Sequence, residues 1–174
     1  MRLVGTVRLG GIMPFYSSQP EPRAGHTATA MALGDGEDCI LVFGGFHRHG
    51  VTDEAYCFWP PAAATGAGAG QWAPLSANGL PPAPRAMHAA ARLGSSDAAI
   101  IVLHGGWGGR DLRGDTCTFS VGAQVWDAPS WRLATVATPS ARQGHTMVAA
   151  AVADESGTDE LLLFGGDTGR GTKS

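Results

Sequence analysis

The stretch Pro84-Arg85-Ala86-Met87-His88 leads through a short apolar segment and a polar turn to a second apolar run, Ile100-Ile101-Val102-Leu103-His104, which ends at Gly105-Gly106. Apolar runs of this length bounded by turn residues are typical of short strands, so the stretch predicts a hairpin. The same order, Arg-x-x-His and then an apolar run closed by a glycine pair, occurs three times. The other two copies start at Arg23 and Arg142 and close at Gly44-Gly45 and Gly165-Gly166.

The three copies recur at a long and nearly constant period. The first glycines of the pairs, Gly44, Gly105 and Gly165, lie 61 and then 60 positions apart. After the glycine pair, the first two copies have an apolar third segment, at 54–59 and 115–121, and a tryptophan. We expect fourth strands to begin at these tryptophans, Trp72 and Trp131, with residues 122–130 as a connector. Four short strands per unit at a fixed long period are the pattern of propeller blades.

This order of elements resembles the kelch repeat over residues 22–166, although the period is longer than the roughly 50 residues of a typical kelch unit. The resemblance implies an all-β fold of kelch-type β-propeller blades. We expect about two complete four-stranded blades plus half a third, in an open arc rather than a closed ring. The expected divisions are 1–20 for an N-terminal strand and connector, 21–79 for blade 1, 80–139 for blade 2, and 140–174 for a partial blade 3 and short tail.

Composition supports this fold class and excludes several partners. The 174 residues include 26 glycines and 11 prolines, which suits many tight turns between short strands. A net charge of −3 disfavours nucleic acid as a partner. No signal-peptide core follows Arg2 and Arg8, and no apolar run approaches the roughly 20 residues of a membrane span. We therefore expect neither secretion nor membrane association.

The cysteines predict a reducing compartment. The chain has three, Cys39, Cys57 and Cys117, which are far apart, odd in number and without a CxxC pair. This pattern indicates neither a disulfide framework nor a zinc site. We expect reduced thiols and a cytoplasmic location, with the nucleus as an alternative. The open strand edges of an incomplete propeller additionally predict self-association, because unpaired backbone groups invite further strands.

The repeated residues have structural interpretations that precede catalytic ones. The glycine pairs let the backbone turn sharply, and Trp72 and Trp131 are expected to fill the space between blades. His26, His88 and His145 occupy equivalent positions, so symmetry spreads them around an axis. They are expected to form hydrogen bonds within each blade rather than a three-histidine metal centre.

Enzymatic activity is the minority prediction. Some kelch propellers are copper oxidases or iron-dependent specifier proteins, but the chain has neither their tyrosines nor a regularly spaced Glu/Asp/His motif. We therefore predict no catalytic residue, no metal and no cofactor within this chain. The alternative is a fragment of a larger kelch propeller with oxidase-like or specifier-like activity, whose site residues lie outside it.

Strand direction places one charge type at each end of the blades. The start of strand one, the end of strand two and the loop from two to three share one end, which we call the loop face. The opposite turns are mainly acidic, as at 34–38. Arginine and aromatic side chains on one surface are typical of sites that bind acidic or phosphorylated peptides. The predicted partner-binding residues are Arg23, Phe46, His47, Arg48, His49, Arg85, Trp107, Arg110, Arg142 and Arg170.

The leading functional hypothesis is therefore a protein–protein interaction module, a scaffold or adaptor that binds an acidic segment through the loop face. The alternative for this surface is a solvated rim, because Asp53, Asp111 and Asp167 lie near the same arginines and can pair with them.

Overall fold

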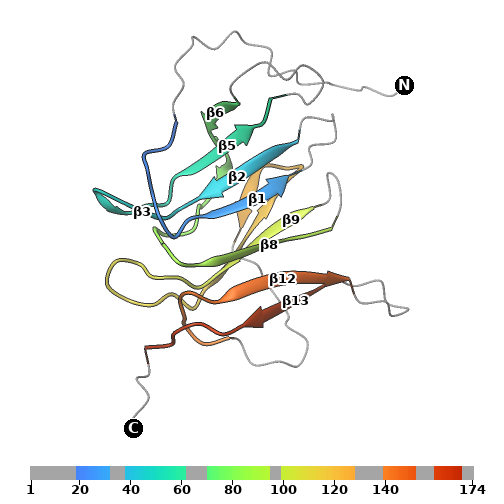
Figure 1. The fold of residues 1–174 in the computed structure, drawn as a ribbon. Helices are drawn as coiled ribbons and strands as arrows, with labels where there is room; N and C mark the ends of the chain where they lie inside the picture. Colours follow the sequence, from blue (N-terminus) through green and yellow to red (C-terminus); the bar gives the residue numbers. More distant parts are fainter. Residues whose placement is uncertain are drawn as a thin grey trace.

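The computed structural model describes residues 19–31, 38–61, 70–94, 99–127, 139–151 and 159–169. Within these ranges the chain is all β: it contains no helix, and its sheets do not close into a barrel. Three sheets lie one after another along the chain, and a small hairpin projects from the first (Figure 1). With no helix in the described ranges, no helical membrane span is found there.

Sheet one contains four strands in the order predicted for unit one. They are β1 (Thr27–Met31), β2 (Cys39–Phe43), β5 (Ala55–Trp59) and β6 (Gln71–Pro74), and each is antiparallel to its neighbour. β6 is an edge strand, as its proline requires, because proline lacks an N–H for a second partner. The loop after Gly44-Gly45 forms a short hairpin of its own, β3 (Phe46–His47) with β4 (Gly50–Val51).

Sheet two has five strands and differs from the prediction at two places. β8 (Ala89–Leu93), β9 (Ile100–His104) and β10 (Thr116–Ser120) lie where expected. The next strand is β11 (Val125–Asp127), which forms inside the predicted connector, whereas the predicted strand at Trp131 lies outside the described residues. β7 (Asn78–Gly79) pairs in parallel with β11. These two residues, which we assigned to unit one, thus pair with a strand of sheet two.

Sheet three is a single antiparallel hairpin of β12 (Thr146–Ala151) and β13 (Asp159–Phe164). It lies where the sequence predicts the half unit. β12 lies beside β8, and β8 in turn lies beside β1, so the first strands of the three units are neighbours in space (Figure 1). Residues 1–18, where the N-terminal strand was expected, lie outside the described residues.

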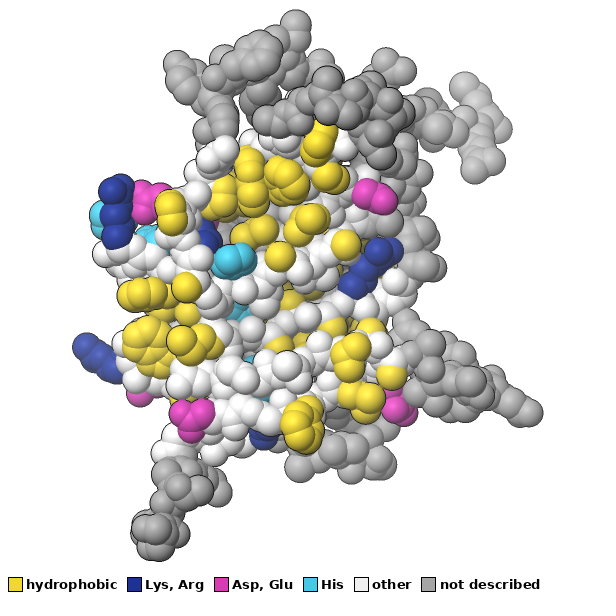
Figure 2. All heavy atoms as spheres, in the orientation of Figure 1, with side chains coloured by type: hydrophobic (Ala, Val, Ile, Leu, Met, Phe, Trp, Pro, Cys, Tyr) yellow, Lys and Arg dark blue, Asp and Glu magenta, His cyan; other side chains and the backbone are white. Residues whose placement is uncertain are grey.

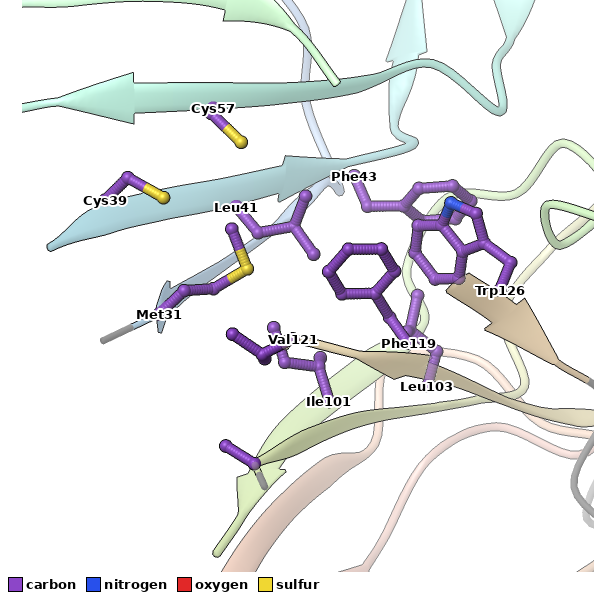
Figure 3. Packing of buried hydrophobic residues seen from close by; sticks show 11 residues of the cluster. Met31, Cys39, Leu41, Phe43, Cys57, Ile101, Leu103, Phe119, Val121 and Trp126 are labelled. Carbon is purple, nitrogen blue, oxygen red and sulfur yellow. The ribbon is translucent and has the colours of Figure 1, made fainter. Parts of the chain in front are cut away.

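The core lies between sheets one and two. β2 is apolar at every position, and its alternate residues Leu41 and Phe43 face sheet two, where Phe119 and Trp126 meet them (Figure 3). The ring of Trp126 lies 5.1 Å from that of Phe43 and 4.8 Å from that of Phe119. Each such buried side chain stabilises the fold by about 1.5–3 kcal/mol.

Trp126 thus lies between two sheets, whereas the tryptophan expected there, Trp131, lies outside the described residues. Trp72 instead stacks on Phe58 of its own sheet, with ring centres 4.7 Å apart. Trp72 lies on the edge strand β6 and Trp126 on β11, which has β7 on its other side, and each is directly opposite a phenylalanine of the third predicted strand.

The cysteines form no disulfide. Cys39 and Cys57 are buried in the core, where a hydrogen bond with Cys39 and burial raise the pKa of Cys57 above its ordinary value. Burial also raises the pKa of Cys117 to about 11. Cys57 and Cys117 are therefore protonated thiols near neutral pH.

Candidate functional site

The Arg-x-x-His segment and the glycine pair form the joint between consecutive units. The Gly45 N–H donates to the carbonyl of Arg85 at 2.9 Å, and the Gly106 N–H donates to the carbonyl of Arg142 at 2.8 Å. The glycine pair that ends the second strand of one unit is therefore hydrogen-bonded to the arginine that opens the next. The motif repeats because the joint repeats.

The joint requires glycine at the first position of each pair. Gly44 and Gly105 both have φ of +67°, in the left-handed region that glycine adopts without strain. A Cβ on Gly44 would lie 2.6 Å from the carbonyl oxygen of Arg85, and one on Gly105 would lie 2.6 Å from that of Arg142. A side chain at either position would push the next unit away.

The histidines also connect units, which corrects the prediction of hydrogen bonds within each blade. His88 is buried, its ring meets that of Phe43 edge-on at 5.5 Å, and its Nε2 lies 2.8 Å from the hydroxyl of Thr27 in the preceding unit. His145 makes the equivalent edge-on contact with His104, also at 5.5 Å. These rings fill the space between sheets.

Burial, with a contribution from Arg85, lowers the pKa of His88 to about 3. Burial and the neighbouring His104 lower the pKa of His145 to about 4. Both imidazoles are therefore neutral at pH 7. Across the described ranges, no group of three metal-binding side chains is assembled around them or elsewhere.

Arg85 is enclosed rather than presented to a partner. Its side chain is 0% exposed, and its guanidinium donates to the carbonyl of Gly105 at 3.0 Å and to both carboxylate oxygens of Asp115 at 3.1 and 2.6 Å. Although burial acts in the opposite direction, these bonds from Arg85 hold the pKa of Asp115 below its ordinary value. Arg85 thus ties the glycine pair of its own unit to the third strand.

Arg23 and Arg142 repeat this arrangement in their own units. Arg23 donates to the carbonyl of Gly44 at 3.1 Å and pairs with Glu54 at 2.7 Å, and its side chain is 3% exposed. Arg142 donates to the carbonyl of Gly165 at 2.9 Å and is half-buried. The three arginines predicted to bind a partner therefore have a structural role, and we remove them from the candidate site. The reason is that a strand-ending glycine carbonyl needs a donor, which the arginine supplies.

The arginines after the glycine pairs are different. Arg48 is 74% exposed, pairs with Glu21 at 2.7 Å and donates to His49 at 2.8 Å. His47 packs edge-on against His49 at 5.6 Å. Arg110 is exposed as well, and among the described residues it has no ion pair. The remaining predicted residue, Arg170, lies outside the described ranges.

Apolar side chains lie between these basic groups on the loop face. Phe46 and Met87 are each 49% exposed, and Trp107 is half-buried. Trp107 forms backbone bridges with Ala86 and Leu112, which hold its loop against the start of its own unit. On the side of β3 in Figure 2, hydrophobic side chains form a patch between two groups of basic side chains.

Met87 is the functional candidate that the sequence interpretation missed. It has φ of +57°, a conformation that costs a non-glycine residue about 1–2 kcal/mol. The equivalent residues of the other units are Gly25 and Gly144, with φ of +66° and +64°. The Met87 N–H donates to the carbonyl of Gly25, and the Gly144 N–H donates to the carbonyl of Met87. A strained, half-exposed methionine where the repeat uses glycine was the available signal, because such outliers often mark functional positions.

Consecutive loops contact one another, so the loop face is continuous. A Cβ on Gly109 would lie 3.2 Å from Val51 of the preceding loop, and one on Gly169 would lie 3.3 Å from Leu112. The joints between units thus fix the positions of these loops relative to one another.

No protein-family model matches the chain, and no curated protein matches it. The candidate site therefore rests on the geometry of this structure.

Proposed function

We propose that the protein is a protein–protein interaction module built from kelch-type blades in an open arc. It acts as a scaffold or adaptor in the cytoplasm or nucleus, and its loop face binds an acidic or phosphorylated protein segment. The binding residues are Phe46, His47, Arg48, His49, Met87, Trp107 and Arg110.

The observation that supports this most is the placement of exposed basic groups beside exposed apolar ones on a continuous surface. Arg48 and Arg110 offer guanidinium donors, and Phe46 and Met87 offer apolar area close by. Arginine and aromatic residues dominate the binding energy of many interfaces, and guanidinium forms charge-assisted bonds with carboxylate and phosphate. A peptide with an acidic and an apolar side chain fits both features.

The ion pair between Arg48 and Glu21 is compatible with this role. The side chains of Arg48 and Glu21 are 74% and 40% exposed, and exposed pairs contribute only about 0–1 kcal/mol. A carboxylate or phosphate of a partner can therefore replace Glu21 at little cost. The joints between units keep the loops in place before binding, which reduces the entropy lost on association.

The test is charge reversal on the loop face. The double variant Arg48→Glu/Arg110→Glu should lower capture of interacting proteins in a pull-down, and lower affinity for immobilised acidic and phosphorylated peptides, by at least about tenfold. Arg48→Lys/Arg110→Lys should bind with intermediate affinity, because lysine keeps the charge but loses the bidentate geometry.

Gln71→Glu is the matched control, since it adds negative charge at an exposed position at the opposite end of the blade. Binding of the wild-type protein should also weaken as salt is raised. Unchanged capture by the Arg48→Glu/Arg110→Glu variant would rule out the loop face as the acidic-segment site.

A further inference from the structure

Sheet three exposes a face that is covered in both other sheets. The residue before the first glycine of each pair is Phe43, His104 or Phe164. Phe43 and His104 are 1% and 2% exposed, whereas Phe164 is 82% exposed. Two positions earlier, Leu41 and Val102 are buried and Leu162 is 54% exposed. Figure 2 shows hydrophobic side chains at the surface over β12 and β13.

The backbone of sheet three also has the conformation seen in the joints, with open space where the next unit would lie. Gly165 has φ of +75°, like Gly44 and Gly105, but a Cβ there would meet nothing within 4 Å. At the two equivalent glycines, the carbonyl oxygen of the next arginine lies 2.6 Å from that point. We call Thr146, Leu162, Phe164 and Gly165 the receiving face.

The other end of the molecule carries the complementary set. His26 is exposed, although its equivalents His88 and His145 are buried in joints. Phe58 and Trp72 pair at 4.7 Å on sheet one, as Phe119 and Trp126 do at 4.8 Å on sheet two. The second of these pairs packs on Phe43 of the preceding sheet. We call His26, Phe58 and Trp72 the covering face.

The two faces match in a polar detail. The Thr27 hydroxyl bonds to His88 in the first joint. Unit two has Ala89 at the position of Thr27, and both ring nitrogens of His145 accordingly lack a hydrogen-bond partner. Unit three has Thr146 there, so it can offer an incoming histidine the bond seen in the first joint.

We propose that the receiving face of one copy binds the covering face of a second copy, forming a further joint that reproduces the one between units one and two. His26 of the second copy then packs on Phe164, and its Arg23 carbonyl accepts the Gly166 N–H. Such a head-to-tail contact joins different surfaces of the two copies, so it closes into a ring if the rotation allows.

The copy number follows from the propeller architecture proposed above. Closed propellers have typically four to eight blades. Each copy has the first two strands of three units, and six is the multiple of three within that range. The expected assembly is therefore a dimer with two identical joints.

The experiment is a mass measurement by light scattering or sedimentation equilibrium on the full chain and three variants. The wild type should have about twice the 17.9 kDa mass of one chain. Phe164→Asp on the receiving face and His26→Asp on the covering face should each give monomers. Leu80→Asp is the control, because Leu80 is 88% exposed and belongs to neither face.

A mixture of the Phe164→Asp and His26→Asp variants distinguishes this joint from a symmetric patch. One mixed pair retains one unaltered joint, between the receiving face of the His26→Asp chain and the covering face of the Phe164→Asp chain. The mixture should therefore form dimers that neither variant forms alone. The loop-face variant Arg48→Glu/Arg110→Glu should dimerise like the wild type, so loss of peptide binding and loss of dimers are separable. A monomeric wild type, or a dimer that persists in either face variant, would overturn the proposal.

Discussion

The joint between sheets one and two and the outer face of sheet three contain the same motif in opposite environments. Phe43 is buried by His88 and Trp126, whereas Phe164, at the same position of its unit, is exposed. Gly44 is crowded by the next unit and Gly165 is not. The motif therefore forms one side of an interface between units. That side is buried only where a neighbouring unit packs against it.

The burial of the repeated arginines differs between the units in the same way. Arg85 belongs to the unit with neighbours on both sides, and it is completely enclosed with a carboxylate partner. Among the described residues, the Arg142 side chain donates to the carbonyl of Gly165 and to Ser140, and it has no carboxylate partner. This difference predicts that loss of the Arg85 side chain destabilises the fold more than loss of the Arg142 side chain.

The largest effect is expected at Arg85. Arg85→Ala should lower the free energy of unfolding by about 3–5 kcal/mol, because it empties a buried site and leaves the Gly105 carbonyl and Asp115 without their donor. Arg142→Ala should lower it by only about 1 kcal/mol, since its bonds are exposed to water. Urea unfolding followed by circular dichroism measures the free energy of unfolding of both variants. Equal losses would contradict the proposed difference between the two arginines.

A smaller effect is expected from the histidine of the complete joint. The pKa of His88 is about 3 in the folded chain and about 6.5 in the unfolded chain, so the unfolded state binds more protons between these values. The stability that depends on neutral His88 is present above about pH 6.5 and is lost as the pH falls below it. Lowering the pH from 7 to 5 should cost about 2 kcal/mol through this residue.

The control is His88→Phe, which keeps a ring against Phe43 but cannot titrate. Its loss of stability between pH 7 and pH 5 should be smaller than that of the wild type, with the remainder coming from groups such as His104 and His145, whose pKa values burial also lowers. An identical pH dependence in the two proteins would show that His88 is not buried as a neutral ring.

The sequence predicts the repeat and most strands because glycine pairs and apolar runs encode them locally. β2 and β9 begin and end within about two residues of the expected positions. β11 was missed because its three residues, Val125–Asp127, are too few for a periodic signal, and the pairing of β7 with β11 depends on a neighbouring unit.

The candidate site was predicted only in part. Counting charges at one end of the blades identified Arg48 and Arg85 alike, although Arg48 is exposed and Arg85 is buried. Whether an arginine bonds to a carbonyl of its own unit depends on three-dimensional contacts about 20 residues away in the chain, such as that from Arg85 to Gly105. The repetition of these arginines in the sequence indicated their structural role, since a residue that recurs with its glycine pair belongs to the repeat's own structure.

The most direct test of the central claim, that the motif is a joint between units, compares two glycines. Gly105→Ala and Gly165→Ala are made in the Phe164→Asp background, so that a second copy does not contribute, and urea unfolding is measured for each. Both variants strain a positive φ, but only the first meets the next unit, at the Arg142 carbonyl and the His145 ring. The account predicts that Gly105→Ala loses more stability than Gly165→Ala by at least about 1 kcal/mol. Equal losses would contradict it.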